Sequence, residues 1–288
     1  MTALKLARWN LTIGGGGPLA VIAGLNVLED LDQTLEVARS LKATTAALGL
    51  PFVFKASFDK ANRSSIASFR GPGLEEGLKI LARVKSEVGV PIATDVHAPE
   101  QAASVAAVAD LVQIPAFLCR QTDLVVAAAR AAAAADGWLH VKKGQFLAPW
   151  DARNIIDKTR EAAGRDLLVI CERGVSFGYN NLVVDMLGIG EMQRLGTPVT
   201  IDATHAVQLP GADPRTSGAS TGGRREGVPI IAKAAVAAGA DGVFLEFHPE
   251  PDKAKCDALS CLPLDSARAL LSTLKAVREA VTSGSEAP

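Results

Sequence analysis

The residues best suited to chemistry in this 288-residue sequence are cations that stand close to hydroxyls. The densest group is FKASFDKANRSS at 54–65, which carries Lys55, Lys60 and Arg63 and then two serines, the first of them Ser64. The arginine guanidinium is planar and donates paired hydrogen bonds, and serine adds a hydroxyl donor on a short side chain. This spacing is therefore typical of a phosphate-binding loop. A solvated basic loop would have the same composition, and the stretch alone does not separate the two.

The elements that must position these groups follow an alternating pattern of β-branched runs and helical stretches. Predicted strands occupy 19–24, 51–57, 91–96, 110–115, 138–143, 166–172, 197–204 and 241–247. Predicted helices lie near 30–48, 73–88, 98–107, 122–135, 150–163, 181–194, 224–239 and 264–281. Eight such units, with no G-x-G-x-x-G opening the first helix, favour an α/β fold of the closed (β/α)₈ TIM barrel type over an open doubly wound sheet. The glycines at 14–17 precede a strand rather than a helix, so they are predicted to form the turn of a short N-terminal β-hairpin.

Polar side chains end every predicted strand, at the edge where a barrel of this kind has its active site. They are Asn26, Lys55, Lys60, Asp95, His97, Gln113, Lys142, Gln145, Glu172, Arg173, Asp202, His205, Glu246 and His248. Taken singly, each is more often a cap or a surface group than a catalyst. Together they would place several cations at the partly buried mouth of the barrel, the end at which the strands finish. Burying these charges costs free energy unless anions neutralise them, so we expect phosphate or carboxylate ligands there.

Composition and charge limit the classes of function. A net charge of −1 gives no reason to expect nucleic acid or an acidic membrane as a partner. No Pro/Ser/Gly-rich linker divides the chain, so we expect one catalytic domain over 1–288. The start lacks a secretory signal pattern and no run reaches transmembrane length, so we expect a cytoplasmic protein. The four cysteines form no C-x-x-C pair, which argues against a zinc clip, and we expect reduced thiols.

Three of the histidines have ordinary structural explanations. His140 lies inside an apolar strand run and is expected to be a satisfied core residue. His97 and His248 stand in loops, where we expect structural caps. Cys119, Cys171 and Cys261 are expected to be buried small hydrophobic residues.

Several long strings resemble the 3-deoxy-D-manno-octulosonate 8-phosphate synthase family, in the same order along the chain. They are KASFDKANRSSIASFRGPGLEEG, IPAFLCRQTDL, VKKGQF, RGVSFGYNNLVVDM, DATHAVQLPG and HPEPDKAKCDALSCLPL. The resemblance implies a (β/α)₈ barrel, usually a homotetramer. It also implies the condensation of phosphoenolpyruvate with D-arabinose 5-phosphate and water, which gives 3-deoxy-D-manno-octulosonate 8-phosphate and inorganic phosphate for lipopolysaccharide synthesis.

The resemblance also implies roles for individual residues. Phosphoenolpyruvate would be contacted by Lys55, Ser57, Lys60, Lys142, Gln145, Arg173 and His205. The sugar phosphate would be held by Arg63, Ser64 and an Arg120 that reaches in from a neighbouring subunit, with Asn62 and Asp95 on the sugar hydroxyls or aldehyde. Gln113, which ends the fourth predicted strand, is counted with the substrate-binding residues.

Asn26 distinguishes two forms of this family. The form that needs a divalent metal has cysteine at the equivalent position, and its other ligands match His205, Glu246 and Asp257 here. An amide nitrogen is no ligand and an amide oxygen binds zinc or iron weakly compared with a thiolate. The resemblance therefore implies the metal-independent form, without a cofactor, in which Asn26 links Asp257 to the bound sugar. The alternative is that Asn26 is only a turn residue.

The implied mechanism begins with attack of phosphoenolpyruvate C3 on the aldehyde carbon, while Lys142 polarises the aldehyde oxygen. Water then adds at C2, and the hemiketal phosphate loses phosphate by C–O cleavage, with Arg173 holding the phosphate throughout. His205 and Asp257 are both candidates for handling the water proton, with Glu246 beside them.

The sequence departs from the family pattern in places, and other functions stay open. Ala67 replaces a common histidine, the segment between the fourth and fifth strands has extra alanines, and the longer loop at 209–226 is a candidate lid. A related condensing enzyme would use erythrose 4-phosphate or a mannosamine. A Schiff-base aldolase would use Lys142 covalently, and a non-catalytic scaffold would bind one substrate at most.

Overall fold

The computed structural model describes residues 2–63, 65–211 and 221–283. Parallel strands form a closed ring, because β14 pairs with β3 on one side and with β11 on the other. The eight barrel strands are β3 (Ala20–Val27), β4 (Phe52–Ser57), β5 (Ile92–Asp95), β6 (Leu111–Ile114), β7 (Trp138–Lys142), β8 (Leu168–Glu172), β11 (Val199–Asp202) and β14 (Gly242–His248). The predicted (β/α)₈ TIM barrel is confirmed.

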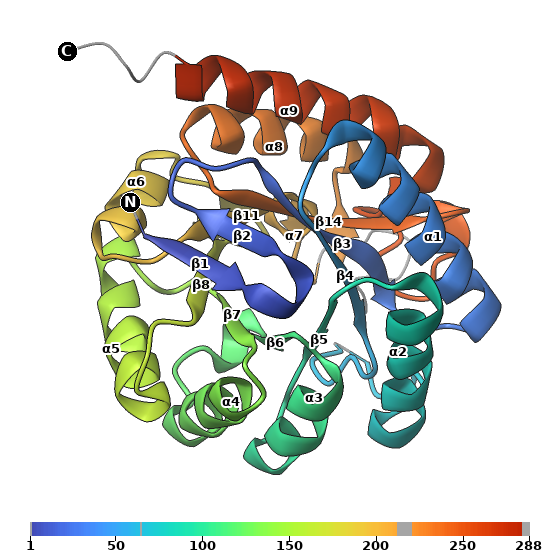
Figure 1. Ribbon diagram of the computed structural model, residues 1–288. Helices are drawn as coiled ribbons and strands as arrows, with labels where there is room; N and C mark the ends of the chain where they lie inside the picture. Colours follow the sequence, from blue (N-terminus) through green and yellow to red (C-terminus); the bar gives the residue numbers. More distant parts are fainter. Residues whose placement is uncertain (1, 64, 212–220, 284–288) are drawn as a thin grey trace.

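Helices surround the ring of strands (Figure 1). They are α1 (Leu31–Leu48), α2 (Leu74–Val88), α3 (Ala102–Val108), α4 (Thr122–Ala134), α5 (Ala152–Ala163), α6 (Leu187–Arg194), α8 (Val228–Ala237) and α9 (Ala267–Ser283), and the single turn α7 (Ala203–Ala206) follows β11. Local chemistry sets their ends: the Asp30 carboxylate caps α1 by accepting the Gln33 amide at 2.8 Å, and Gly49 ends α1 at φ +67°. Within the described part of the chain, none of the helices has the length and apolar character needed to cross a bilayer.

The predicted helix at 181–194 is wrong in its first part. Residues Leu182–Val183 form β10, which pairs antiparallel with β9 (Val175–Ser176). Gly178 and Asn180 have φ values of +70° and +54°, so the chain reverses between these two short strands instead of entering a helix.

The predicted N-terminal hairpin is present, with β1 (Ala3–Leu6) antiparallel to β2 (Leu11–Gly14). The prediction that the four glycines form its turn is wrong, because the chain reverses at 7–10, where Asn10 takes a φ of +47°. The glycines instead lead from β2 toward β3, and Gly14 is needed there because an added Cβ would lie 2.2 Å from the Thr2 carbonyl oxygen.

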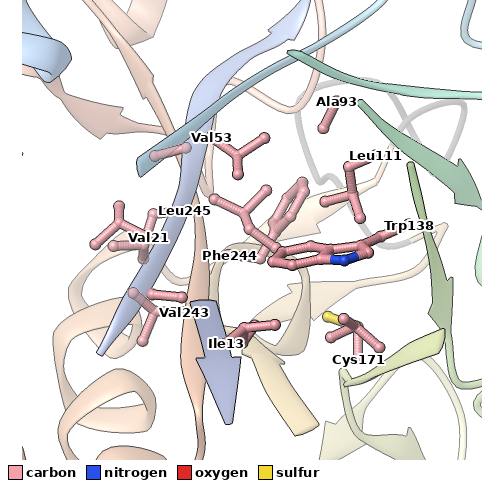
Figure 2. Packing of buried hydrophobic residues seen from close by; sticks show 14 of the residues in the cluster. Ile13, Val21, Val53, Ala93, Leu111, Trp138, Cys171, Val243, Phe244 and Leu245 are labelled. Carbon is pink, nitrogen blue, oxygen red and sulfur yellow. The ribbon is translucent and has the colours of Figure 1, made fainter. Parts of the chain in front are cut away.

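The hairpin covers the amino end of the barrel. Figure 1 shows it lying across the ring of strands. Its Trp9 donates to Asp110, which directly precedes β6, at 2.8 Å. Figure 2 shows Ile13 of β2 among core side chains such as Trp138 and Phe244, which come from distant parts of the sequence. Because this end is covered, ligands must enter at the opposite end, where the strands finish.

Candidate active site

A cavity of about 590 Å³ lies at the carboxyl ends of the barrel strands. The predicted site residues that line it are Lys55, Lys60, Asn62, Arg63, Asp95, Gln113, Lys142, Gln145, Arg173, His205 and Asp257. Asn26, Ser57 and Glu246 are buried next to it and hydrogen-bond to the lining residues Asp257, Asp95 and Lys55. The fold thus gathers polar groups from both ends of the chain.

Two further predicted residues, Ser64 and Arg120, are not placed at this site. Ser64 lies outside the described residues, as does the 212–220 part of the candidate lid. Arg120 is exposed and does not reach the cavity of its own chain. Its expected role at a neighbouring subunit's site stays a prediction.

Asn26 lies within β3 rather than just past the strand, where the sequence pattern put it. The pairing of β3 with β4 shifts register between Gly24 and Val27, and an added Cβ at Gly24 would lie 2.0 Å from the Lys55 carbonyl oxygen. This irregularity extends the strand and leaves Asn26 only 4% exposed. The alternative that Asn26 is only a turn residue is therefore wrong.

The Asn26 amide occupies the space between two carboxylates. Its Nδ2 donates to Glu246 and, at 3.0 Å, to Asp257 Oδ2. The reverse amide orientation would set its oxygen against two carboxylate oxygens, which repel it, so the NH₂ group is the one that faces them. Asn26 Oδ1 has no hydrogen-bond partner among the described residues.

A divalent ion fits this arrangement poorly. Ligand atoms of His205, Glu246 and Asp257 lie within 4.8 Å of one another, which is close enough for a shared cation. The Asn26 NH₂ group, however, points at the carboxylate oxygens that such an ion would need, and an amide NH₂ cannot coordinate a metal. In this orientation the NH₂ group takes the place between the carboxylates that a shared cation would take.

Lys55 is a buried cation whose partners are in the protein itself. Only 1% of it is exposed, and its Nζ lies 2.8 Å from Ser57 Oγ, 3.3 Å from Glu246 Oε1 and 3.8 Å from Asp95 Oδ1. Burial and the nearby charge of Lys60 lower the pKa of Lys55 to about 8, although the two carboxylates oppose this shift.

Lys142 and His205 share a carboxylate that was not among the predicted site residues. Asp202 is fully buried, forms an ion pair with Lys142, and lies 2.8 Å from His205 Nδ1. Burial acts to raise the pKa of Asp202, but His205 and Lys142 hold it well below its ordinary value. A carboxylate at Nδ1 favours the proton there. His205 Nε2 faces two other carboxylates, Glu246 Oε2 at 3.5 Å and Asp257 Oδ2 at 3.6 Å. The only sequence signal for Asp202 was its place at a strand end.

Arg173 is buried with part of its guanidinium unused. Its Nη2 lies 3.2 Å from Gln208 Oε1, whereas Nη1 has no partner within the described ranges. Gln145 Oε1 is also buried without a partner there. Burial lowers the pKa of Arg173 from its ordinary value, with nearby carboxylates opposing the shift. Buried polar atoms of this kind point to a ligand that completes their hydrogen bonds. Gln208 was missed because nothing in its spacing set it apart.

The expectation that anionic ligands must neutralise all the cations of the mouth is too broad. Lys55 and Lys142 already have carboxylate partners, because the same strand ends supply both signs of charge. Arg63 contacts Cys256 Sγ at 2.6 Å and Asp257 at 3.8 Å, and its Nε lacks a partner in the part of the chain that is described. Arg63 and Arg173 are therefore two cations with buried donors to spare.

The structural expectations for His140 and for three of the cysteines are confirmed. His140 is 0% exposed, and its ring nitrogens lie 3.0 Å from Gln113 Oε1 and 2.9 Å from Thr200 Oγ1. All four cysteines are free and buried.

Comparison with known proteins adds independent findings. A family model described as the DAHP synthetase I family matches residues 2–283. Several similar relatives carry the name 2-dehydro-3-deoxyphosphooctonate aldolase. The one from Desulfosudis oleivorans is 54% identical over 274 residues, which cover 95% of each chain. The one from Nitratidesulfovibrio vulgaris is 57% identical over 257 residues, or 89% of this chain and 91% of its own. The one from Geobacter metallireducens is 52% identical over 273 residues, or 95% and 97%.

Proposed function

The chain belongs to the DAHP synthetase I family, and from that premise we propose that it condenses phosphoenolpyruvate with D-arabinose 5-phosphate and water. The products are 3-deoxy-D-manno-octulosonate 8-phosphate and inorganic phosphate, as the octonate named in its relatives suggests. The chain is a transferase in this reaction, and we take 1–288 as one catalytic domain.

The observation that carries the proposal is the set of unsatisfied donors in one cavity. Arg63 and Arg173 line the same 590 Å³ space, and each has a buried guanidinium nitrogen without a partner in the described structure. Two phosphorylated substrates supply two anions for two guanidinium groups, which bind phosphate through paired hydrogen bonds. A scaffold without ligands would leave both nitrogens unsatisfied.

We assign the phosphoenolpyruvate subsite to the carboxyl ends of β4, β7, β8 and β11. Arg173 holds the phosphate, and Gln145, whose Oε1 is unpartnered, orients the substrate beside it. The other members are Lys55, Ser57, Lys60, Lys142 and His205. The sugar phosphate subsite includes Arg63, with Asn62, Asp95 and Gln113 on the rest of the sugar. Ser64, which lies outside the described residues, is assigned to this subsite by the family resemblance alone.

The chemistry then follows from the cations that are held in place. C3 of phosphoenolpyruvate attacks the aldehyde carbon, and the negative charge that forms on the aldehyde oxygen is stabilised by Lys142. Water adds at C2, and C–O cleavage of the hemiketal phosphate releases phosphate to Arg173. His205 Nε2, which lies 3.6 Å from Asp257 Oδ2, is placed to take or return the water proton together with that carboxylate.

The metal-independent form is supported by Asn26. Its NH₂ group ties Glu246 to Asp257, so hydrogen bonds hold the carboxylates that a cation would otherwise bridge. A neutral amide can orient Asp257 toward the sugar, which is the positioning task that an ion performs in the other form.

We propose a homotetramer in which Arg120 completes the sugar phosphate subsite of a neighbouring subunit. The support is its exposure and its absence from the residues that line the cavity of its own chain.

The test is a comparison of aldehydes with the purified protein. D-arabinose 5-phosphate should give a product with the mass of the eight-carbon phosphate at a rate far above that with erythrose 4-phosphate or a mannosamine. Faster reaction with either alternative would overturn the assignment. Borohydride added with substrate should leave Lys142 unmodified, because the Lys142 amine is engaged by Asp202 and forms no covalent bond to substrate in the proposed reaction. A labelled Lys142 would indicate a Schiff-base aldolase instead.

A further inference from the structure

Two buried charged residues next to the site have no role in the reaction described above. Lys143 and Glu172 are 1% and 2% exposed, and each is one residue away from a proposed phosphoenolpyruvate contact, Lys142 or Arg173. Side chains alternate along a strand, so neighbours of inward-facing residues face outward. Accordingly, Lys143 and Glu172 do not line the catalytic cavity but a second hollow of about 460 Å³.

Lys143 uses its ammonium group to fix the loop that follows β7. The Nζ lies 3.4 Å from the Gly144 carbonyl oxygen, 3.1 Å from the Leu147 carbonyl oxygen and 3.4 Å from Glu172 Oε2. The two carbonyls stand on either side of Gln145 in the sequence, so the ammonium holds the backbone that carries this side chain. Gln145 lines both the cavity and the second hollow.

Glu172 fixes the loop that follows β8. Its Oε1 accepts the Arg173 amide at 3.0 Å and the Gly174 amide at 2.6 Å. Gly174 has a φ of +88°, a conformation that other residues rarely adopt, so the chain turns sharply just after Arg173. The carboxylate therefore defines where the backbone of Arg173 begins this turn.

We propose that Lys143 and Glu172 are positioning residues for phosphoenolpyruvate binding. Their ion pair joins the two loops at a fixed separation, one carrying Gln145 and the other Arg173, and both loops must reach the same small anion. Burying two charges carries a desolvation penalty that an apolar pair would avoid, so stability alone does not account for the pair. The hydrogen bonds to loop backbone do account for it, because the ammonium holds two backbone carbonyls and the carboxylate holds two backbone amides. This inference rests on the proposed function.

The experiment measures steady-state kinetics for both substrates with Lys143→Met, Glu172→Gln and the double variant. Methionine keeps the length of the lysine stem, and glutamine keeps an oxygen for the two amides. We expect KM for phosphoenolpyruvate to rise on the order of 10-fold in each single variant, with KM for D-arabinose 5-phosphate changed less than about twofold. Because the two residues act as one unit, the double variant should lose no more than about the worse single variant.

Asp110→Asn serves as the matched control, because Asp110 is an equally buried carboxylate with ion pairs at the opposite end of the barrel. It should lower Tm and leave both KM values unchanged. The inference is overturned if the Lys143 and Glu172 variants raise both KM values equally, or if they change neither KM value. It is also overturned if the Asp110→Asn control selectively raises KM for phosphoenolpyruvate. If the unmodified protein releases no phosphate from the two substrates, the proposed function fails and this inference fails with it. For a variant that is too slow to assay, calorimetric titration measures its affinity for phosphoenolpyruvate alone. An affinity equal to that of the wild type overturns the inference, and a weaker affinity supports it.

Discussion

The two ends of the barrel hold buried charge in different ways. At the amino end, Asp110 is 0% exposed and both of its oxygens accept hydrogen bonds, from Trp9 at 2.8 Å and from the Ile92 amide at 2.9 Å. At the mouth, Arg173 and Gln145 are also buried, yet each has a polar atom without a partner in the described structure. The first network is complete within the protein, and the second is complete only with a ligand.

The contrast distinguishes residues that stabilise the fold from residues that bind a ligand. Asp110 also pairs with Arg8 at 2.6 Å and with Lys85 at 3.0 Å, which joins the hairpin and α2 to the barrel. Asp241 is the partial exception at this end, since its Oδ1 has no hydrogen bond, but Arg278 stands 3.9 Å away. Changes at the amino end should therefore affect unfolding, and changes at the mouth should affect turnover.

The largest effect is expected at Arg173. Replacing it with alanine removes the guanidinium that holds the departing phosphate, and kcat/KM should fall by about 10³-fold or more. Thermal unfolding should change little, because the side chain leaves an unsatisfied atom in the folded state. Phosphate release and Tm are measured on the same preparation. Near-normal turnover in this variant would remove Arg173 from the mechanism.

The opposite behaviour is expected for Asp110→Asn. Loss of the charge leaves Arg8 and Lys85 without their shared carboxylate, and the free energy of unfolding should fall by about 3 kcal/mol. Urea denaturation measures this change, while kcat/KM should stay within about twofold of the wild type. A loss of activity in fully folded protein would show that the two ends are not separate.

Asn26→Cys tests how the mouth is held together without an ion. A thiolate beside His205, Glu246 and Asp257 completes a four-ligand set, so zinc affinity should rise about tenfold or more over the wild type. Zinc titration followed by calorimetry measures the change, and Asn26→Ser, which lacks the thiolate, is the control. Equal zinc affinity in all three proteins would contradict the structural role given to the amide.

The last effect is a pH dependence of stability and concerns His140, in the barrel interior between the two ends. Burial lowers its pKa from 6.5 to about 3, so the folded protein keeps it neutral while the unfolded chain takes up a proton. The free energy of unfolding should thus decrease as the pH falls from about 6.5 toward 3, by at most about 1.4 kcal/mol per pH unit. Urea midpoints at several pH values should show a shallower decline in His140→Gln. Parallel declines in the two proteins would exclude this contribution.

The sequence predicted the barrel well because alternation of strands and helices repeats eight times and averages over local errors. The prediction failed where the conformation of a single residue sets the course of the backbone. The register shift at Gly24, which brings Asn26 into β3, depends on a close approach to the Lys55 carbonyl that no periodicity reveals. Likewise, the apolar residues at 182–183 fit a helical pattern but pair as a strand.

For the candidate site, the strand-end rule predicted most of the residues that come together but not how they pair. It named Lys142 and His205 correctly as neighbours of the cavity, yet gave no reason to choose Asp202 as the carboxylate between them. Pairing across strands depends on barrel closure, which a linear sequence does not display. The rule also placed Glu172 at the mouth, whereas strand alternation turns Lys143 and Glu172 toward the second hollow.

Phosphate release from phosphoenolpyruvate, with and without D-arabinose 5-phosphate and a strong chelator, tests the central claim most directly. The account predicts release that requires both substrates and continues at the same rate after chelation, because two anions complete the open network of the mouth and an amide stands where an ion would bind. Release without the sugar phosphate, or activity that stops on chelation and returns with added metal, would contradict it.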